Sequence, residues 1–376
     1  MCTQSKLIDT RDSCFFNGWS EGTYTIGGHI QGALNFSVSW LSQLTDHEII
    51  SQLERMHIKK SCELILYGKE SHILEAKLKN LGFPHVTRDE NLINKAINNN
   101  EQLAKLQHFE KLVHPKWLLS EIEKQTSIEI YEVSWGFESD YKAGHIPTSK
   151  YVDLRLFEDH NTWNKTSNKK IHSLIMKYGI DITKPIILYS RNKLEASRLA
   201  VILLETGAED VRILDGGFNS WLNKKYPLEQ GIKHININRK DKNLMLKHTP
   251  YLIDINTVQH SFNKSNSNII SIRSFDEYNG TQSGYCYIDK GGRIQNSIHG
   301  EDIDAYHNLD GTMFNYELIE KGWLNKGISP NNENIFYCGT GWRASEVLYF
   351  AYIMGWKNVF VYDGGWFEWN QEASIG

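Results

Sequence analysis

"NIFYCGTGWRASEVLYFAYIMGWKNVFVYDGGWFEW", residues 334–369, repeats the pattern of "PIILYSRNKLEASRLAVILLETGAEDVRILDGGFNSW", residues 185–221. Ser190 stands 17 residues before Gly207, and Cys338 stands 17 residues before Gly355. In both stretches an Asp-Gly-Gly sequence follows at the same further offset, and a tryptophan lies four residues after its last glycine. The two stretches are therefore copies of one structural unit.

A weaker third copy lies near the N-terminus, in "CELILYGKESHILEAKLKNLGFPHV" at residues 62–86. Each copy is preceded by a matching half: "LIDTRD…GGHIQGALNF", "IYEVSW…AGHIPTSKYVD" and "IISIRSFDEY…KGGRIQNSIHG". The period of about 120 residues is too long for a solenoid, so each copy is expected to be a domain.

The fold class follows from how strand and helix patterns alternate within a copy. Short apolar runs such as "ILYS" and "VFVY" are separated by helical patterns such as "ASEVLYFAYIM". We therefore expect three tandem α/β domains, each with a mostly parallel central sheet flanked by helices. Polar tracts place the domains at residues 1–110, 111–238 and 248–376. Residues 299–330 exceed what the repeat requires, which indicates an insertion in the third domain.

Composition excludes several classes of protein. The formal net charge of the 376 residues is −4, with basic residues scattered, so no nucleic-acid partner is expected. No apolar run of about 18 residues is present, so no membrane span is expected. The N-terminal residues lack the apolar core of a secretory signal, which favours the cytoplasm, or the periplasm if a leader has been removed. Five widely spaced cysteines argue against a disulfide framework and indicate mostly free thiols.

The loop "CGTGWR" carries the chemistry. Cys338 follows a predicted central strand, where open α/β sheets bind ligands. Gly339 and Gly341 allow the backbone to curl into an anion-binding nest, and the following helix adds its positive end. Arg343 adds a fixed cation. A thiol in this setting is expected to have a lowered pKa and to react as a thiolate.

Three chemistries use such a cysteine: phosphate-ester transfer, arsenate-type reduction and sulfur transfer. Phosphatase loops have the spacing C-x5-R, whereas Cys338 and Arg343 have the spacing C-x4-R. The smaller ring suits one sulfur atom better than a phosphoryl group. A phosphatase or arsenate reductase is therefore disfavoured.

With its six-residue loop, its Asp-Gly-Gly plus tryptophan and its upstream "GHI" element, the chain resembles the rhodanese (thiosulfate sulfurtransferase) family over nearly its whole length. The resemblance implies that Cys338 takes a sulfane sulfur from a donor and holds it as a persulfide. It implies a small anionic donor and a thiol, cyanide or sulfur-carrier protein as acceptor, as in molybdopterin or thiolation pathways, with no cofactor or metal. The implied catalytic residues are Cys338 and Arg343, and the substrate-binding residues are Gly339, Thr340, Gly341 and Trp342.

The donor is expected to be thiosulfate, because "WR" provides a charge, although "CGTG" looks like the loops of 3-mercaptopyruvate sulfurtransferases. In the second copy Ser190 and Glu195 replace the cysteine and the arginine, and the first copy has a shortened loop around Gly68. We expect both domains to be inactive. A non-catalytic rhodanese-fold binding protein is the alternative, and it predicts that Cys338→Ser leaves all function intact.

Other residues allow two interpretations each. Arg293, which replaces the histidine of "GHI", is a candidate for substrate binding, whereas Arg273 is expected to form a structural ion pair. Trp342 either packs over the sulfur or caps the core. Thr340 and Ser345 either donate hydrogen bonds to the loop sulfur or the donor, or cap the helix. Cys286 is either a resolving thiol or, more simply, a packed strand residue. "HGEDIDAYHNLDG" matches no metal-binding pattern and is expected to be a solvated loop.

Overall fold

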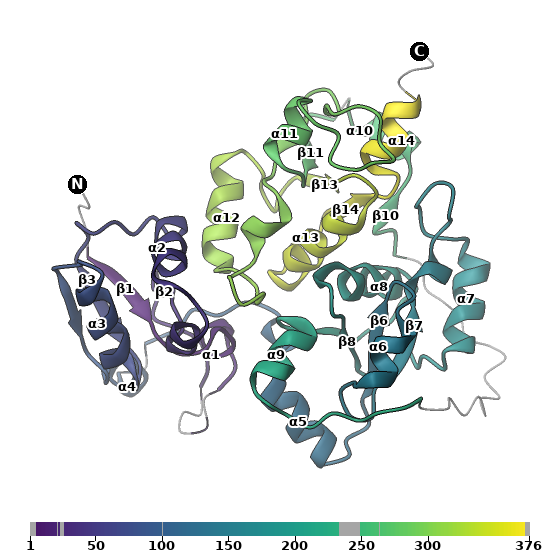
Figure 1. Ribbon diagram of the computed structural model, residues 1–376. Helices are drawn as coiled ribbons and strands as arrows, with labels where there is room; N and C mark the ends of the chain where they lie inside the picture. The colour runs from purple at the N-terminus through teal and green to yellow at the C-terminus, as the bar shows by residue number, and fades with distance from the viewer. Residues whose placement is uncertain are drawn as a thin grey trace. The chain divides into compact units, whose positions relative to one another are not determined.

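The computed structural model describes residues 5–20, 22, 26–99, 101–232, 249–262 and 264–372. It contains three sheets of parallel strands flanked by helices (Figure 1), which confirms the expected fold class. The first sheet has the strand order β2 (Leu34–Asn35), β1 (Lys6–Asp9), β3 (Leu64–Tyr67) and β4 (Val86–Arg88). The second has the order β5 (Leu112–Val113), β9 (Val211–Leu214), β8 (Ile186–Tyr189), β6 (Glu129–Ser134) and β7 (Lys150–Asp153). The third has the order β10 (Leu252–Ile253), β14 (Val359–Tyr362), β13 (Glu333–Tyr337), β11 (Ser267–Ser271) and β12 (Ile298–His299).

The helices follow the strands in the order expected of crossover connections. Around the first sheet lie α1 (Ser13–Asn17), α2 (Asp46–Arg55), α3 (Ser71–Asn80) and α4 (Leu92–Asn98). The second has α5 (Pro115–Glu123), α6 (Glu138–Ala143), α7 (Asn168–Lys177), α8 (Lys193–Glu205) and α9 (Gly217–Asn223). The third has α10 (Ile255–Ser261), α11 (Phe275–Asn279), α12 (Tyr316–Asn325), α13 (Trp342–Ile353) and α14 (Gly365–Glu372). Short 3₁₀ helices span Val38–Ser42, Phe109–Lys111, Leu154–Phe157 and Ile303–Tyr306.

One hydrogen bond is repeated in all three sheets. The strands β3, β8 and β13 each end in a buried tyrosine, whose hydroxyl accepts the backbone N–H of an isoleucine. The pairs are Tyr67 with Ile30, Tyr189 with Ile146 and Tyr337 with Ile294, at 3.2, 3.1 and 3.2 Å. This isoleucine ends each "GHI" or "GRI" element, so the element locks its loop onto the end of the central strand.

The chain divides into two compact units. The first comprises Met1–Leu112 and His307–Glu320, and the second comprises Val113–Tyr306 and Lys321–Gly376. The second unit thus contains both five-stranded sheets, and α8 packs directly against α13 within it. The predicted boundary between residues 238 and 248 lies outside the described residues.

Part of the insertion expected in the third domain, His307–Glu320, belongs to the first unit. The indole N–H of Trp40 donates to Asp310 Oδ2 at 2.6 Å, and the Gln52 amide donates to Asn308 Oδ1 at 2.8 Å. The Arg55 guanidinium lies 4.6 Å from the centre of the Phe314 ring. The prediction of a solvated loop is therefore wrong for this part of the segment, because its side chains are partners of buried residues.

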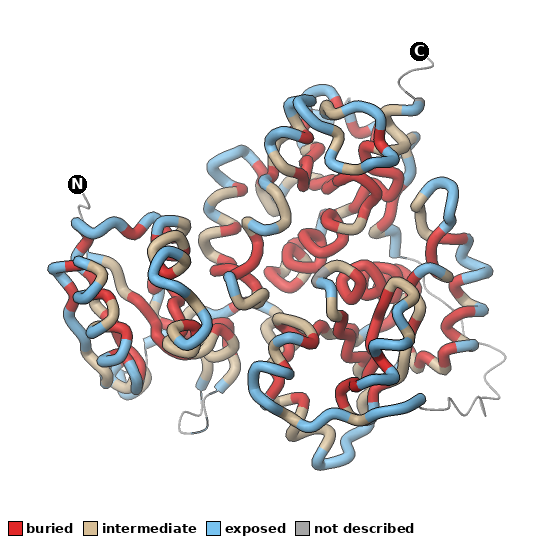
Figure 2. Tube along the Cα trace, in the orientation of Figure 1, coloured by how far each residue is buried: buried red, intermediate tan, exposed pale blue. Residues whose placement is uncertain are grey.

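Burial is nearly complete where the third sheet meets α13 (Figure 2). Ile335, Phe336 and Tyr337 of β13 are fully buried, and most residues of α13 are buried too. A strand covered on both faces needs the continuous apolar run that the sequence shows. Among the described residues, no helix is both long and apolar enough to cross a membrane.

Candidate active site

Cys338 lies directly after β13, the middle strand of the third sheet, and α13 begins at Trp342. Its side chain is buried and its thiol is free. The first N–H groups of α13 have no partner within the helix, so they present partial positive charge where the loop enters. The carboxyl end of a central parallel strand is thus followed by a thiol and a helix N-terminus, as the sequence predicted.

The loop backbone is held by the start of α14. The carbonyl oxygen of Cys338 accepts the N–H of Trp366 at 2.8 Å, and that of Gly339 accepts the N–H of Phe367 at 3.0 Å. This close approach occurs at Gly365, where a side chain would collide with both carbonyls. The second Asp-Gly-Gly sequence therefore serves to bring α14 against the reactive loop.

Both loop glycines are required by geometry. Gly341 has a φ of +82°, a region that favours glycine, and a Cβ there would lie 2.9 Å from the carbonyl oxygen of Asp363. A Cβ on Gly339 would overlap the ring of Tyr285. Ser345, inside α13, donates its hydroxyl to the Gly341 carbonyl at 2.8 Å, a bond to the loop backbone that the sequence did not predict.

Arg343 is buried and already paired. Its Nη2 donates to Glu277 Oε1 at 2.7 Å and its Nη1 to Glu277 Oε2 at 2.9 Å, while Asp302 Oδ1 lies 3.1 Å from Nη1. Its Nε is buried without a hydrogen-bond partner. Burial is the largest single influence and acts to lower the pKa of Arg343, but its hydrogen bonds to Glu277 and the attraction of nearby negative charges together raise the pKa well above the ordinary value. The cation expected beside the loop is thus present, and two carboxylates hold it there.

Glu277 and Asp302 were not singled out from the sequence as partners of the loop. Glu277 closes a capping box with Ser274 at the start of α11, which is a readable signal, but the box predicts a helix start and no ion pair. Asp302 belongs to the segment that was expected to be a solvated loop. Within the described residues, no cluster of three or more metal-binding side chains is present.

Tyr285 and Tyr287 cover the loop on another side. The Tyr285 ring lies against Gly339, and the Arg343 guanidinium is 5.3 Å from its centre. The Thr340 side chain hydrogen-bonds Tyr287, but burial has the larger effect and raises the pKa of Tyr287. Cys286, between them, is an exposed free thiol in a turn. The expectation of a packed strand residue is therefore wrong.

Trp342 points toward the second sheet. Its indole N–H donates to Glu158 Oε2 at 3.2 Å, and its ring meets Trp135 edge-on at 4.9 Å. Ring contacts continue from Trp135 to Trp163, from Trp163 to Tyr287 and from Tyr287 to Tyr285. We call these five residues the aromatic row. Each of them is partly solvent-exposed, so the row forms a wall beside the loop.

Two further arginines were singled out from the sequence. Arg293 is exposed and lies over the ring of Tyr278 at 5.0 Å, and its role in substrate binding stays a prediction. Arg273 is fully buried, as a structural residue should be, but it donates to the Ser271 hydroxyl and the Gly292 carbonyl rather than to a carboxylate.

The equivalent loop of the second sheet has different residues at the positions of Cys338 and Arg343. Ser190 donates its hydroxyl to the Asn192 carbonyl. Glu195 is buried, and burial raises the pKa of its carboxyl to about 7, against hydrogen bonds from Asn192 and Ser190. A hydroxyl group thus takes the place of the thiol and a carboxyl group that of the cation, which supports the prediction that this loop is inactive.

Comparison with known proteins separates the second and third sheets in the same way as the structure does. A family model described as a rhodanese-like domain matches residues 114–224 and 254–372, which contain most of the second and third sheets. The thiosulfate sulfurtransferase YnjE of Escherichia coli K12 is 35% identical over 386 residues, covering 98% of this chain and 87% of YnjE. The mouse 3-mercaptopyruvate sulfurtransferase is 22% identical, covering 72% of this chain and 95% of that protein.

Solved structures agree with these relatives. The crystal structure of YnjE superposes with a TM-score of 0.91 at 33% identity, covering 98% of this chain and 91% of that one. EanB, solved with a cysteine persulfide and ergothioneine, superposes with a TM-score of 0.92 at 28% identity, covering 99% and 95%. Another EanB structure contains hercynine, with a TM-score of 0.90 at 28% identity and coverage of 98% and 93%.

Proposed function

The chain belongs to the rhodanese-like domain family and is a sulfurtransferase of that family, and from this premise we propose that Cys338 carries the transferred sulfur as a persulfide. The observation that carries the proposal is the position of Cys338: a buried free thiol between the end of β13 and the N-terminus of α13. That position favours the binding of an anionic donor next to the thiol.

The proposed donor is thiosulfate. The Cys338 thiolate attacks the outer sulfur, the sulfur–sulfur bond of thiosulfate breaks, and sulfite leaves with the bonding electron pair. An acceptor thiolate or cyanide then attacks the outer persulfide sulfur, and Cys338 is released as a thiolate. The N–H groups at the start of α13 are the proposed donors to the leaving sulfite and to the persulfide.

Arg343 has a narrower proposed role than a substrate clamp. Because Glu277 occupies both Nη groups, the part of Arg343 left for the sulfur or the donor is its buried Nε–H. We therefore propose that donor binding depends mainly on backbone N–H groups from Gly339 to Arg343. Similarity to the thiosulfate sulfurtransferase YnjE supports thiosulfate as the donor. Similarity to the mouse 3-mercaptopyruvate sulfurtransferase makes 3-mercaptopyruvate the alternative donor.

Intact-protein mass after incubation with thiosulfate tests the proposal. The wild type is expected to gain one sulfur atom that cyanide removes, whereas Cys338→Ala gains none. If the wild type gains sulfur from 3-mercaptopyruvate alone, the donor is corrected. If neither donor loads the protein, the proposal fails and a non-catalytic binding protein becomes the better interpretation.

The aromatic row favours a second candidate acceptor, a molecule that carries a quaternary ammonium group. Aromatic faces bind quaternary ammonium groups, and hercynine, which EanB binds, combines such a group with an imidazole ring. If the outer sulfur of the Cys338 persulfide is transferred to the imidazole carbon of hercynine, the C–H becomes C–SH and the persulfide returns to a thiol. This transfer needs no further reactant.

Mass analysis of loaded protein mixed with hercynine tests this acceptor, with ergothioneine as the expected product. Trp163→Ala should weaken transfer to hercynine more than transfer to cyanide, because Trp163 lies in the middle of the aromatic row. If Trp163→Ala transfers sulfur to hercynine at the wild-type rate, a small thiol becomes the better candidate acceptor.

The first unit has a proposed role in structure alone. Its sheet has the strand order of the other two without the edge strand, and a glycine, Gly68, follows its central strand where Cys338 follows β13. We propose that it is a third, inactive rhodanese-like domain. Its loop contains no thiol, so a Cys338 variant should have no residual loading.

A further inference from the structure

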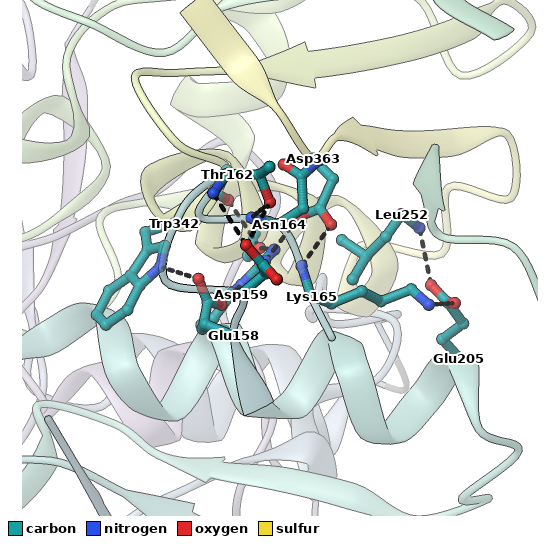
Figure 3. A network of polar contacts seen from close by, with 12 residues as sticks. Glu158, Asp159, Thr162, Asn164, Lys165, Glu205, Leu252, Trp342 and Asp363 are labelled. Carbon is teal, nitrogen blue, oxygen red and sulfur yellow. Dashed lines mark hydrogen bonds and ion pairs between the residues drawn. The ribbon is translucent and has the colours of Figure 1, made fainter. Parts of the chain in front are cut away.

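The loop around Cys338 is contacted by charged residues of the second sheet's domain (Figure 3). Glu158 accepts the indole N–H of Trp342 with one carboxylate oxygen, at 3.2 Å, and Arg198 Nε with the other, at 2.6 Å. Arg198 comes from α8, and the side chains of both charged residues are completely buried. A buried ion pair therefore ends on a residue of the reactive loop.

Arg198 has two further contacts on the same side. Its Nη2 forms an ion pair with Asp363 Oδ1 at 2.7 Å, and its Nη1 donates to the Ser345 hydroxyl at 3.4 Å. Ser345 in turn holds the carbonyl of Gly341. The other oxygen of Asp363 accepts the backbone N–H of Lys165 at 2.8 Å, so Asp363 is held from two sides.

Asp363 is important because it lies two residues before the start of α14. The first N–H groups of α14 bind the carbonyls of Cys338 and Gly339. Arg198 is thus linked to the loop by three routes: through Glu158 to Trp342, through Ser345 to Gly341, and through Asp363 to the start of α14. One cation from the inactive domain supports the whole loop.

The repeat explains why this cation cannot come from the active domain itself. Arg198 stands eight residues after Ser190, and its equivalent, eight residues after Cys338, is Glu346. Glu346 accepts a hydrogen bond from Ser197 at 3.2 Å, on the side of the inactive loop. Each helix therefore places a charged side chain on the side of the other copy's loop. Arg198 of α8 lies on the side of the Cys338 loop, and Glu346 of α13 lies on the side of the Ser190 loop.

We propose that Glu158 and Arg198 are positioning residues for sulfur transfer, through which the inactive second domain fixes the geometry of the Cys338 loop. The inference rests on the proposed persulfide function. Its chemical basis is that a displacement of about 1 Å in a reacting group can cost about 100-fold in rate. Loss of Arg198 also leaves Glu158 and Asp363 buried without their shared cation.

The test is the single-turnover rate of persulfide formation from thiosulfate in the full chain. Arg198→Met should lower the rate at saturating thiosulfate by roughly 10- to 100-fold, with a smaller change in KM. Arg198→Lys should recover part of the rate, because it restores the charge. Glu158→Gln, which keeps the shape of the side chain, should lower the rate in the same sense and decides the question if Arg198→Met does not fold.

Glu205→Gln is the matched control. Glu205 is buried in the same network, where it pairs with Lys165 Nζ at 3.0 Å and accepts the N–H of Leu252 at 3.0 Å, contacts that do not involve the loop (Figure 3). It should load sulfur at the wild-type rate. Equal losses in Glu205→Gln and Glu158→Gln, or wild-type rates in Glu158→Gln, would overturn the inference. A wild type that loads no sulfur refutes the proposed function instead, so the two failures are distinguishable.

Discussion

Arg343 and Glu277 form a two-point ion pair, with N–O distances of 2.7 and 2.9 Å, beside the loop of Cys338. Asp302 is a second carboxylate on the same guanidinium, at 3.1 Å. One positive charge thus faces two negative charges. The pair orients the start of α13, but it leaves little net positive charge for an anionic donor.

Glu277→Gln should therefore change donor binding and stability in opposite directions. With one carboxylate removed, Arg343 attracts thiosulfate more strongly, and KM for thiosulfate should fall several-fold at low salt. Loss of the charge-assisted hydrogen bonds should destabilise the fold by about 1.5–3 kcal/mol. Steady-state kinetics and thermal unfolding measure the two effects.

The control for this variant is Glu301→Gln. It removes one negative charge next to Asp302, but Glu301 pairs with Lys326 rather than with Arg343. KM should stay near the wild-type value. An equal fall in KM in both variants would mean that overall charge, and not the Arg343 pair, governs donor binding.

Gly339→Ala should prevent sulfur loading, because the added methyl group overlaps the Tyr285 ring. The loop or the ring must then move, and the thiol loses its place beside the N-terminus of α13. Adding Tyr285→Ala to Gly339→Ala should restore part of the loading rate. Intact-protein mass over time measures this, and a double variant no better than Gly339→Ala would show that the loop itself, not the ring, rejects a side chain.

The sequence was sufficient for the architecture because the evidence for it is local. Strand and helix patterns, the repeated Asp-Gly-Gly and the placement of Cys338 all lie within stretches of fewer than 40 residues. The partners of the loop are different. Glu277 is 66 residues from Arg343, and Glu158 is 184 residues from Trp342, with no spacing rule to connect them.

The same reason limits what can be predicted for a single charged side chain. The carboxylate partners of Arg343 come from α11 and from the segment after β12, and no local pattern connects them to the loop. Neither burial nor pairing of a charged side chain follows from the residue type, since both depend on which distant segment packs against it.

Glu195 should make stability depend on pH. Burial raises the pKa of its carboxyl to about 7, from an ordinary value of 4.5. Between these values the folded chain binds more protons than the unfolded chain, so stability falls as pH rises from about 4.5 through 7. A shift of this size corresponds to about 3 kcal/mol at most.

Glu195→Gln removes that titration. The variant should melt at a higher temperature than the wild type at pH 8, and the difference should shrink toward pH 5. Thermal unfolding across this range measures it, with Glu209→Gln, at an exposed position on the same domain, as the control. A constant difference at all pH values would contradict the assignment to Glu195.

Arg55 should hold the segment His307–Glu320 in place within the first unit. Its guanidinium donates to the Gln52 side chain at 3.1 Å and to the His307 carbonyl at 2.8 Å, and it lies over the Phe314 ring. Arg55→Ala should cost about 1.5–3 kcal/mol of local stability. Hydrogen exchange in residues 307–320 should then accelerate by roughly 10-fold or more.

Arg88→Ala, which breaks exposed pairs with Glu75 and Glu90 in the same unit, should leave exchange in this segment unchanged. Acceleration in both variants would indicate general loosening of the unit instead of release of the segment.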